Sequence, residues 1–287
     1  LALTANVPTQ QFNRGPFQEI HRHAAADFPA VLKPVVKRSY QATRVDMLPL
    51  ALRQAIELAV SGRPGPVQVD IPFNVFQEEA DVELEPSARE RTRKRPGADP
   101  ADIEQALTML AAAERPVLFI GHGVTLAEAA GELTEAAERL NIPVISSPNG
   151  MGCIPMGHPL SLGFIGRNGT FPANQAGRHT DLVIAVGARF DDRSSSSWIP
   201  GYSWNFPASK LVHVDIDVDE IGRNYPPDLG ITADAGSFLR QLLAAAQANG
   251  GGRPARRAWL AEIEGWRREW EDFTAPNFDI HAAPIRP

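Results

Sequence analysis

The sequence predicts an α/β protein: a doubly wound parallel sheet, preceded by the C-terminal part of a second α/β domain. Short apolar segments bounded by glycine or proline alternate with helical segments over residues 99–248, a pattern typical of parallel sheets with helices on both faces. The 287 residues are enough for two modest domains. A hydrophobic content of 43% and a charged content of 22% exclude wholesale disorder.

Residues 1–74 form the first block, which is half of a doubly wound unit. It opens on the apolar run Leu1–Thr4, which predicts a buried strand. A helix is expected at Met47–Val60, with Pro49 in its first turn, and a strand at Val67–Pro72 after a glycine- and proline-rich stop. The apolar residues that recur at helical spacing are Leu48, Leu52, Ala55, Ile56 and Ala59.

Residues 75–98 are expected to form a charged linker, and residues 99–248 the second domain. The elements predicted for this domain are helix Ile103–Ala113, strand Pro116–Ile120, helix Leu126–Leu140, strand Pro143–Ser147, strand Asp181–Val186, strand Leu211–Asp217 and helix Ala235–Ala248. Residues 249–287 are expected to be a linker and a further helix. In that helix Trp259, Ile263, Trp266 and Trp270 predict a docking face against the body of the protein or a partner subunit.

Composition also limits the partners and the compartment. A net charge of -6 gives little electrostatic support for a nucleic-acid or anionic-membrane partner. No apolar run approaches the roughly 18 residues that span a bilayer, and the first residues do not resemble a signal peptide. The single cysteine, Cys153, predicts a reducing cytoplasm. The strand-like start at Leu1 and the linker-like end at 280–287 predict an internal fragment of a longer protein.

Ligands of an open parallel sheet bind beyond the carboxyl ends of its strands. There, Gly121 and Gly123 predict that the backbone approaches a phosphate and that the next helix offers free amides, with an ordinary tight turn as the alternative. Leu126 stands where a dinucleotide fingerprint needs its third glycine. Asp215 and Asp234 are candidates for ribose or adenine contacts, with helix capping as the alternative.

Two other kinds of site find little support. The second strand of the domain ends in serines and lacks the acidic residue that holds an NAD ribose, which argues against a nicotinamide dehydrogenase. His21 and His23 have neither helical spacing nor a nearby thiolate. We therefore expect no metal site in this chain.

Several segments together resemble one family, the thiamine-diphosphate-dependent carboligases, and most closely the acetolactate synthase large subunit. They occur in the family's order over nearly the whole chain. The segments are Val7–Pro8, Gly15–Glu19, Lys37–Tyr40, Ser61–Val67, Gly187–Arg193, His213–Asp217 and Glu220–Asn224.

The resemblance implies an enzyme of three α/β domains, of which this chain holds the end of the pyrimidine-binding domain and the whole Rossmann-like central domain. It implies thiamine diphosphate as cofactor, Mg²⁺ in a third domain outside the chain, and FAD in the central domain. The implied reaction decarboxylates a 2-keto acid and transfers the two-carbon unit to a second keto acid, in branched-chain amino-acid biosynthesis. The fragment alone is expected to be inactive. A homodimer or homotetramer and a small regulatory subunit are also implied.

Carried over by position, the resemblance places Phe17 and Gln18 at the thiamine cofactor and Lys37 at the substrate channel. It assigns Arg193 to the carboxylate of the second keto acid, because a guanidinium fork suits a planar carboxylate. A salt bridge from Arg193 to Asp191 or Asp192 is the alternative. The implied flavin contacts are Arg63, His122, Ser147, Pro148, Ile165, Gly166, Arg167, Asn168, Gly187, Ala188, Arg189, Phe190, Asp191, Asp215, Ile216, Asp234 and Ala235.

The chain also departs from the family's pattern. The departures are His122 for a glycine, Arg38 for a histidine, Arg167–Asn168 for Met-His, and Ser194–Trp198 for the residues after the arginine. Pro200–Tyr202 followed by Trp204 resembles instead the sulfoacetaldehyde acetyltransferases. A non-catalytic flavin- or nucleotide-binding module is a further alternative, but it leaves the first block without a role.

Overall fold

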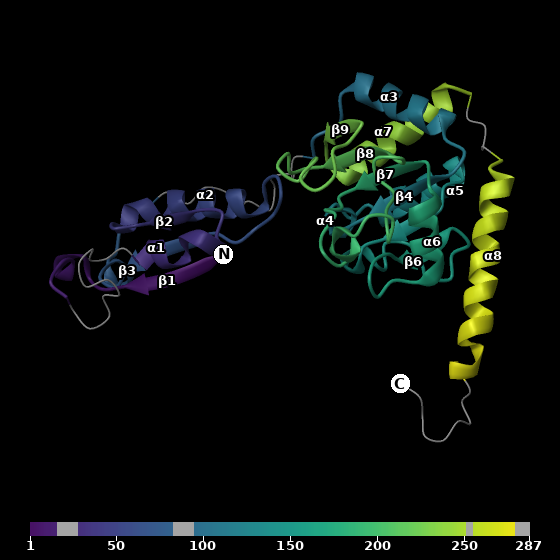
Figure 1. Cartoon of the computed structure of the whole chain (residues 1–287). Helices are drawn as coiled ribbons and strands as arrows, with labels where there is room; N and C mark the ends of the chain where they lie inside the picture. The colour runs from purple at the N-terminus through teal and green to yellow at the C-terminus, as the bar shows by residue number, and fades with distance from the viewer. Residues whose placement is uncertain (16–27, 83–94, 251–254, 279–287) are drawn as a thin grey trace. The chain divides into compact units, whose positions relative to one another are not determined.

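The computed structural model of the protein describes residues 1–15, 28–82, 95–250 and 255–278 and divides the chain into two compact units, Leu1–Lys94 and Arg95–Pro287 (Figure 1). The first unit holds β1 (Ala2–Asn6), α1 (Phe28–Leu32), β2 (Ser39–Gln41), α2 (Leu48–Val60) and β3 (Gln68–Pro72). The second unit holds α3 (Pro100–Ala112), β4 (Pro116–Ile120), α4 (His122–Leu126), α5 (Ala130–Leu140), β5 (Val144–Ser146), β6 (Ser161–Phe164), α6 (Phe171–His179), β7 (Leu182–Val186), β8 (Lys210–Asp215), β9 (Leu229–Thr232), α7 (Ala235–Ala248) and α8 (Arg257–Thr274).

The first unit is a parallel three-stranded sheet in the order β1-β3-β2. Its apolar core joins β3 to α2 through Val69, Ile71 and Ala55. One detail of the sequence prediction was wrong. The start of β1 is not buried, because this strand lies at the sheet edge and Leu3 is exposed. Helix α2 forms as predicted, with Ala55 buried and Ile56 exposed.

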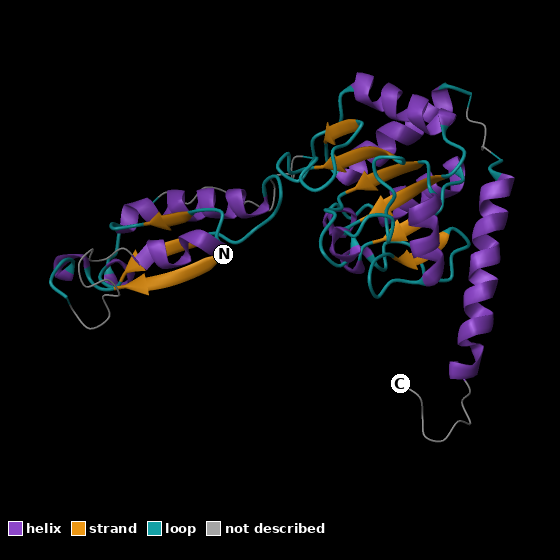
Figure 2. Ribbon diagram, viewed as in Figure 1, coloured by secondary structure: helices purple, strands orange, loops and turns teal. Residues whose placement is uncertain are grey.

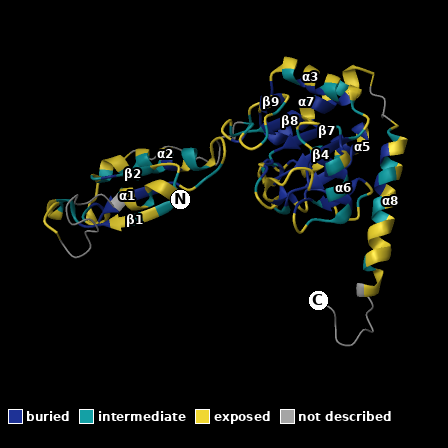
Figure 3. Ribbon diagram, in the orientation of Figure 1, coloured by how far each residue is buried: buried dark blue, intermediate teal, exposed yellow. Residues whose placement is uncertain are grey.

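The second unit confirms the predicted doubly wound parallel sheet (Figure 2). Its strand order is β6-β5-β4-β7-β8-β9, and every pair is parallel. Side chains alternate between the two faces of each strand. In β4, Leu118 and Ile120 join the core under α3, α5 and α7, whereas Val117 and Phe119 join the core under α6 and α8. The strands are accordingly the most deeply buried part of this unit (Figure 3).

Four helices and strands of this unit escaped the sequence prediction, and one predicted helix starts later than expected. The strands β6 and β9 lie at the two edges of the sheet, and half of the β9 residues are exposed, so neither gives a long apolar run. Helix α6 was also missed. The helix expected at Leu126–Leu140 begins only at Ala130, as α5. The short helix α4 before it was missed; it ends at Leu126, and the chain then turns with Glu128 at a φ of 55°.

Helix α8 completes the second unit. Trp259 and Ile263 enter the core of the sheet face that α6 also covers, and the Trp259 indole N–H donates to the Pro116 carbonyl at 3.2 Å. Farther along the helix, the Arg267 guanidinium donates to the carbonyls of Pro159 (2.7 Å) and Ser161 (2.6 Å). The predicted docking face therefore packs against the chain's own sheet, and the unit extends beyond residue 248.

Candidate functional site

The strand order places a topological switch point between β4 and β7, where the chain reverses its direction of progress across the sheet. The turns after these two strands touch through glycines. A Cβ on Gly121 would overlap the Gly187 carbonyl oxygen, and one on Gly123 would lie 2.6 Å from the Gly187 Cα. The Gly123 amide donates to the Gly187 carbonyl at 3.0 Å. Gly121 and Gly123, which were expected to approach a phosphate, instead let the turn after β4 pack closely against the turn after β7. The Gly123 amide is therefore already hydrogen-bonded.

Substitution of Gly187 tests how tightly these turns fit. Its φ is 56°, and a Cβ there would lie 2.7 Å from the Gly123 Cα, so Gly187→Ala should lower the free energy of unfolding by about 1–3 kcal/mol. Gly131→Ala is the matched control, because a Cβ at Gly131 in α5 meets nothing within 4 Å and should be neutral or stabilising. Urea unfolding followed by tryptophan fluorescence measures both. Equal stability of the two variants would contradict the close fit.

The loop after β7 carries the residue expected to bind a carboxylate. The Asp191 carboxylate accepts from the Ser194 amide (2.9 Å) and hydroxyl (2.8 Å), and the Asp192 carboxylate pairs with Arg167 at 2.7 Å. Arg193 is exposed and makes no ion pair with any residue in the described part of the chain. The salt bridge to Asp191 or Asp192, the alternative role for Arg193, is thus not the observed arrangement.

The loop after β7 is anchored by an aromatic cluster around Phe190. The Phe190 ring contacts the rings of Phe119, Trp204, Phe206 and Tyr225 at centroid distances of 5.1–5.7 Å. Phe190 and Trp204 are both buried. Trp204, part of the segment that resembles the sulfoacetaldehyde acetyltransferases, therefore has a packing role.

His213 at the end of β8 ties two strand-end loops together. Its Nε2 lies 3.0 Å from the Ala188 carbonyl, and its Nδ1 accepts from the Gly222 amide at 3.3 Å. This pattern fits the neutral ring with the proton on Nε2. Burial lowers the pKa of His213, while the bond to Ala188 and the charge of Glu220 act in the opposite direction.

The depressed pKa of His213 predicts a pH-dependent stability. As pH falls below the ordinary value of 6.5, the unfolded chain takes up this proton before the folded one, so the free energy of unfolding decreases. His213→Gln should remove this part of the dependence, whereas His179→Gln, at an exposed position, should keep it. Urea unfolding between pH 5 and 8 measures the slope. A wild-type slope in the His213→Gln protein would refute this role.

The two aspartates expected to contact a ligand, Asp215 and Asp234, each accept a hydrogen bond from a backbone amide two or three residues farther along the chain. The Asp234 carboxylate caps α7 by accepting from the Ser237 amide at 3.1 Å, and Asp234 is buried, which is the capping alternative. The Asp215 carboxylate accepts from the Asp217 amide at 2.9 Å and is half-buried at the end of β8. Asp215 is thus the more accessible of the two.

In the first unit, Lys37 binds the end of α2. Its ammonium donates to the carbonyls of Leu58 (2.7 Å), Ser61 (2.8 Å) and Arg63 (3.0 Å), an arrangement that suits a cation at a helix C-terminus. A substrate contact by Lys37 requires this cap to open. The Arg63 side chain is exposed in this unit. Phe17 and Gln18, like His21 and His23, lie outside the described residues.

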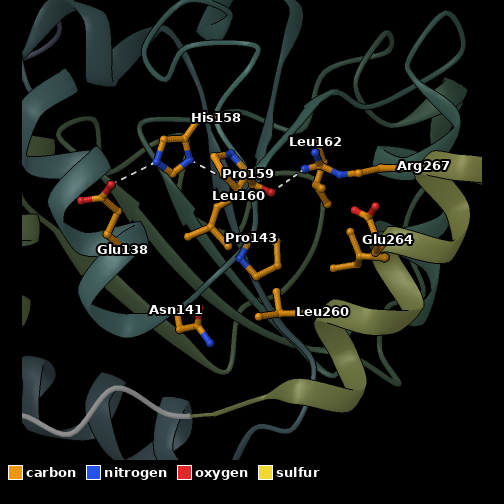
Figure 4. A pocket seen from close by; sticks show the side chains of 11 residues that line it. Glu138, Asn141, Pro143, His158, Pro159, Leu160, Leu162, Leu260, Glu264 and Arg267 are labelled. Carbon is orange, nitrogen blue, oxygen red and sulfur yellow. Dashed lines mark hydrogen bonds and ion pairs between the residues drawn. The ribbon is translucent and has the colours of Figure 1, made fainter. Parts of the chain in front are cut away.

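A cavity of about 590 Å³ lies at the opposite, amino-terminal edge of the large sheet, between α5, the segment before β6, and α8 (Figure 4). Leu160 and Pro143 line it with apolar surface, and the His158 Nε2 lies 3.2 Å from the Glu138 carboxylate at its rim. Its position separates it from the strand ends where ligands of this fold bind.

The residues that the structure describes hold neither a metal cluster nor a membrane-spanning helix. No group of three or more His, Cys, Asp or Glu side chains among them is placed to hold a metal ion. In the same part of the chain, the helices all fall short of the length and apolarity needed to cross a membrane.

The six-stranded sheet lies within a region that matches a known family. Residues 103–242 match the family "Thiamine pyrophosphate enzyme, central domain". The chain belongs to the thiamine pyrophosphate enzymes. Thiamine pyrophosphate is another name for thiamine diphosphate, so the family resemblance seen in the sequence is confirmed.

Curated relatives extend the match to both units. A probable acetolactate synthase large subunit from Methanocaldococcus jannaschii is 36% identical over 100% of this chain and 46% of the relative. The acetolactate synthase isozyme 3 large subunit of Escherichia coli is 32% identical over 100% of the chain and 48% of the relative. A glyoxylate carboligase from Escherichia coli O157:H7 is 37% identical over 93% of the chain and 44% of the relative. The chain thus spans about half the length of these relatives.

The flavin contacts that the resemblance implies differ in how far the structure exposes them. Except for Arg63 they all lie at or near the carboxyl edge of the six-stranded sheet, because its strands are parallel. The buried members are Ser147, Ile165, Gly166, Ala188, Phe190, Asp234 and Ala235. The exposed members are His122, Arg167, Asn168 and Arg189.

Sequence reasoning missed the polar residues that shape the loop after β7. Ser197 and Asp192 contact Arg167, which comes from the loop after β6. Asn224 donates to the Phe190 carbonyl at 2.8 Å. No sequence pattern marks these partners, since they lie 25–34 residues apart.

Proposed function

We propose that this chain is part of a carboligase of the acetolactate synthase type. Such an enzyme decarboxylates a 2-keto acid and transfers the two-carbon unit to a second keto acid. The observation that carries the proposal is similarity to acetolactate synthase large subunits along both units of the chain, at 36% and 32% identity. The alternative, a non-catalytic nucleotide-binding module, would not explain why the first unit is also similar to acetolactate synthase large subunits.

The chain's own contribution is to orient the acceptor. Thiamine diphosphate, when bound, supplies the carbon nucleophile of such a reaction. The exposed guanidinium of Arg193, which no described carboxylate neutralises, is suited to bind the acceptor carboxylate in a bidentate manner. Fixing the carboxylate directs the acceptor carbonyl and lowers the entropic part of the barrier.

We also propose FAD at the carboxyl edge of the six-stranded sheet. The donor set suits an adenine dinucleotide: the Arg189 guanidinium is exposed beside the switch point for a diphosphate, and the half-buried Asp215 carboxylate suits ribose hydroxyls. The Gly123 amide, bound to Gly187, is not part of this set.

Titration of the whole 287-residue chain with FAD, followed by flavin fluorescence, should show saturable binding that Arg189→Ala weakens. The whole chain is needed because truncation after residue 248 removes Trp259 from the core. Arg139→Ala is the matched control, because Arg139 is exposed near the end of α5, the helix that leads into the start of β5. A folded chain, shown by circular dichroism, without saturable binding would contradict this site.

Glyoxylate carboligase activity is a second candidate, because a relative of that name is 37% identical over 93% of the chain. Mass spectrometry of the products of the full-length protein separates the candidates. Pyruvate alone, pyruvate with 2-ketobutyrate, glyoxylate alone and sulfoacetaldehyde with phosphate are the substrates to compare. We expect five- and six-carbon acetohydroxy acids from the first two. A product from glyoxylate or sulfoacetaldehyde only would overturn the acetolactate synthase proposal.

A second subunit is part of the proposal, because the two acetolactate synthase relatives carry the name large subunit. We propose that a small regulatory subunit binds the full-length protein, which itself forms a homodimer or homotetramer. Size-exclusion chromatography with light scattering measures the assembly.

A further inference from the structure

The loops after β6 and β7 are joined by a cluster of three polar side chains, which we call the Arg167 cluster. The Arg167 guanidinium pairs with the Asp192 carboxylate at 2.7 Å and donates to the Ser197 hydroxyl at 3.1 Å. The Ser197 hydroxyl in turn donates to the other Asp192 oxygen at 2.8 Å. Both oxygens of the Asp192 carboxylate are thereby engaged.

The same two loops meet at the backbone of Arg193. The Arg167 amide donates to the Arg193 carbonyl at 3.2 Å. Gly166 has a φ of 114°, and a Cβ there would overlap that carbonyl oxygen and lie 2.8 Å from its carbon. The backbone that carries the Arg193 guanidinium is thus fixed beside Arg167.

The conformation of the loop holds Ser197 against Asp192. Ser196, Ser197 and Trp198 have φ values of 49°, 57° and 54°, which are unfavourable for residues with side chains and persist only where surroundings determine them. The Ser197 amide donates to the Asp192 carbonyl at 2.9 Å, and the Trp198 indole donates to the Phe190 carbonyl at 2.9 Å. The cluster is therefore built into the loop.

We infer that Arg167 is a positioning residue that keeps Asp192 from capturing the neighbouring Arg193, so that the Arg193 guanidinium stays available for the carboxylate of an acceptor keto acid. Arg193 follows Asp192 directly, and an unpaired Asp192 carboxylate would compete with the substrate for the same guanidinium. Arg167 and Ser197 belong to two of the segments in which the chain departs from the family's pattern, and here those two segments touch. The inference rests on the role proposed for Arg193.

A charge-rescue experiment in the full-length enzyme tests this competition. Arg167→Ala should raise the KM for the acceptor about three- to fivefold, in the range of an exposed ion pair. Adding Asp192→Asn to that variant should restore the KM to within about twofold of wild type, because the competing charge is gone. The rise should also shrink in 1 M salt. Flavin content is measured for each variant, since a direct flavin contact by Arg167 would change it and would not respond to Asp192→Asn.

Arg139→Ala is the matched control and should change nothing. The Arg139–Glu135 pair (2.9 Å; side chains 55% and 47% exposed) resembles the Arg167–Asp192 pair (2.7 Å; 56% and 53%) but lies in α5. A double variant no better than Arg167→Ala, or an unchanged KM in Arg167→Ala, would overturn the inference alone if Arg193→Ala still raises the acceptor KM. An unchanged KM in Arg193→Ala would overturn both the proposed role of Arg193 and the inference.

Discussion

Trp259→Ala should lower the free energy of unfolding by about 3–5 kcal/mol, the cost of truncating a large buried aromatic side chain. Trp259 is 2% exposed, packs among the residues of the second sheet face, and donates a hydrogen bond to the Pro116 carbonyl at the start of β4. Its loss therefore leaves a cavity under α8 and removes a hydrogen bond to the Pro116 carbonyl. Urea unfolding followed by far-UV circular dichroism measures the change.

Trp270→Ala provides the control in the same helix. Trp270 is 37% exposed and stacks on Phe171 at a centroid distance of 6.2 Å, so its truncation should cost no more than about 1.5 kcal/mol. If both variants lose the same stability, α8 is not part of the core of the second unit.

The second large effect concerns substrate recognition by Arg193. In the full-length enzyme, Arg193→Ala should weaken the apparent affinity for the acceptor keto acid by about 1.5–3 kcal/mol, or roughly ten- to hundredfold. Arg193→Lys should recover only part of this, since lysine keeps the charge but lacks the planar fork. Stability should hardly change, because Arg193 is exposed and forms no ion pair with a described residue.

Steady-state kinetics with the acceptor varied at saturating pyruvate measures these affinities. Arg268→Ala, at an exposed position of α8, should behave as wild type. If the Ala, Lys and wild-type enzymes agree within about twofold, well below the loss of a charged hydrogen bond, Arg193 does not bind the acceptor.

The interior strands of the large sheet could be predicted from the sequence, and its edges could not. Segments such as Pro116–Ile120 are buried on both faces, so that every residue is apolar and the signal is strong. β9 is buried on one face only, and its four residues give a weak pattern. The stop between α4 and α5 depends on a left-handed residue, Glu128, which no glycine or proline marks.

The candidate site was predictable in outline for a similar reason. Parallel strands bring all their carboxyl ends to one edge, so the strand pattern alone is enough to place Gly121, Gly187 and Asp215 near one another. The contacts within the site follow from loop packing. Nothing in the sequence indicates that Gly187 fills the space beside Gly121, or that Arg167 binds Asp192 25 residues away.

We propose that the full-length protein catalyses a decarboxylation that depends on thiamine diphosphate. Carbon dioxide release from pyruvate by that protein is the most direct test. After dialysis against a chelator, we expect no release until thiamine diphosphate and Mg²⁺ are both added, and we expect the 287-residue chain alone to release none. Release that is independent of thiamine diphosphate, or turnover by the 287-residue chain alone, would contradict this account.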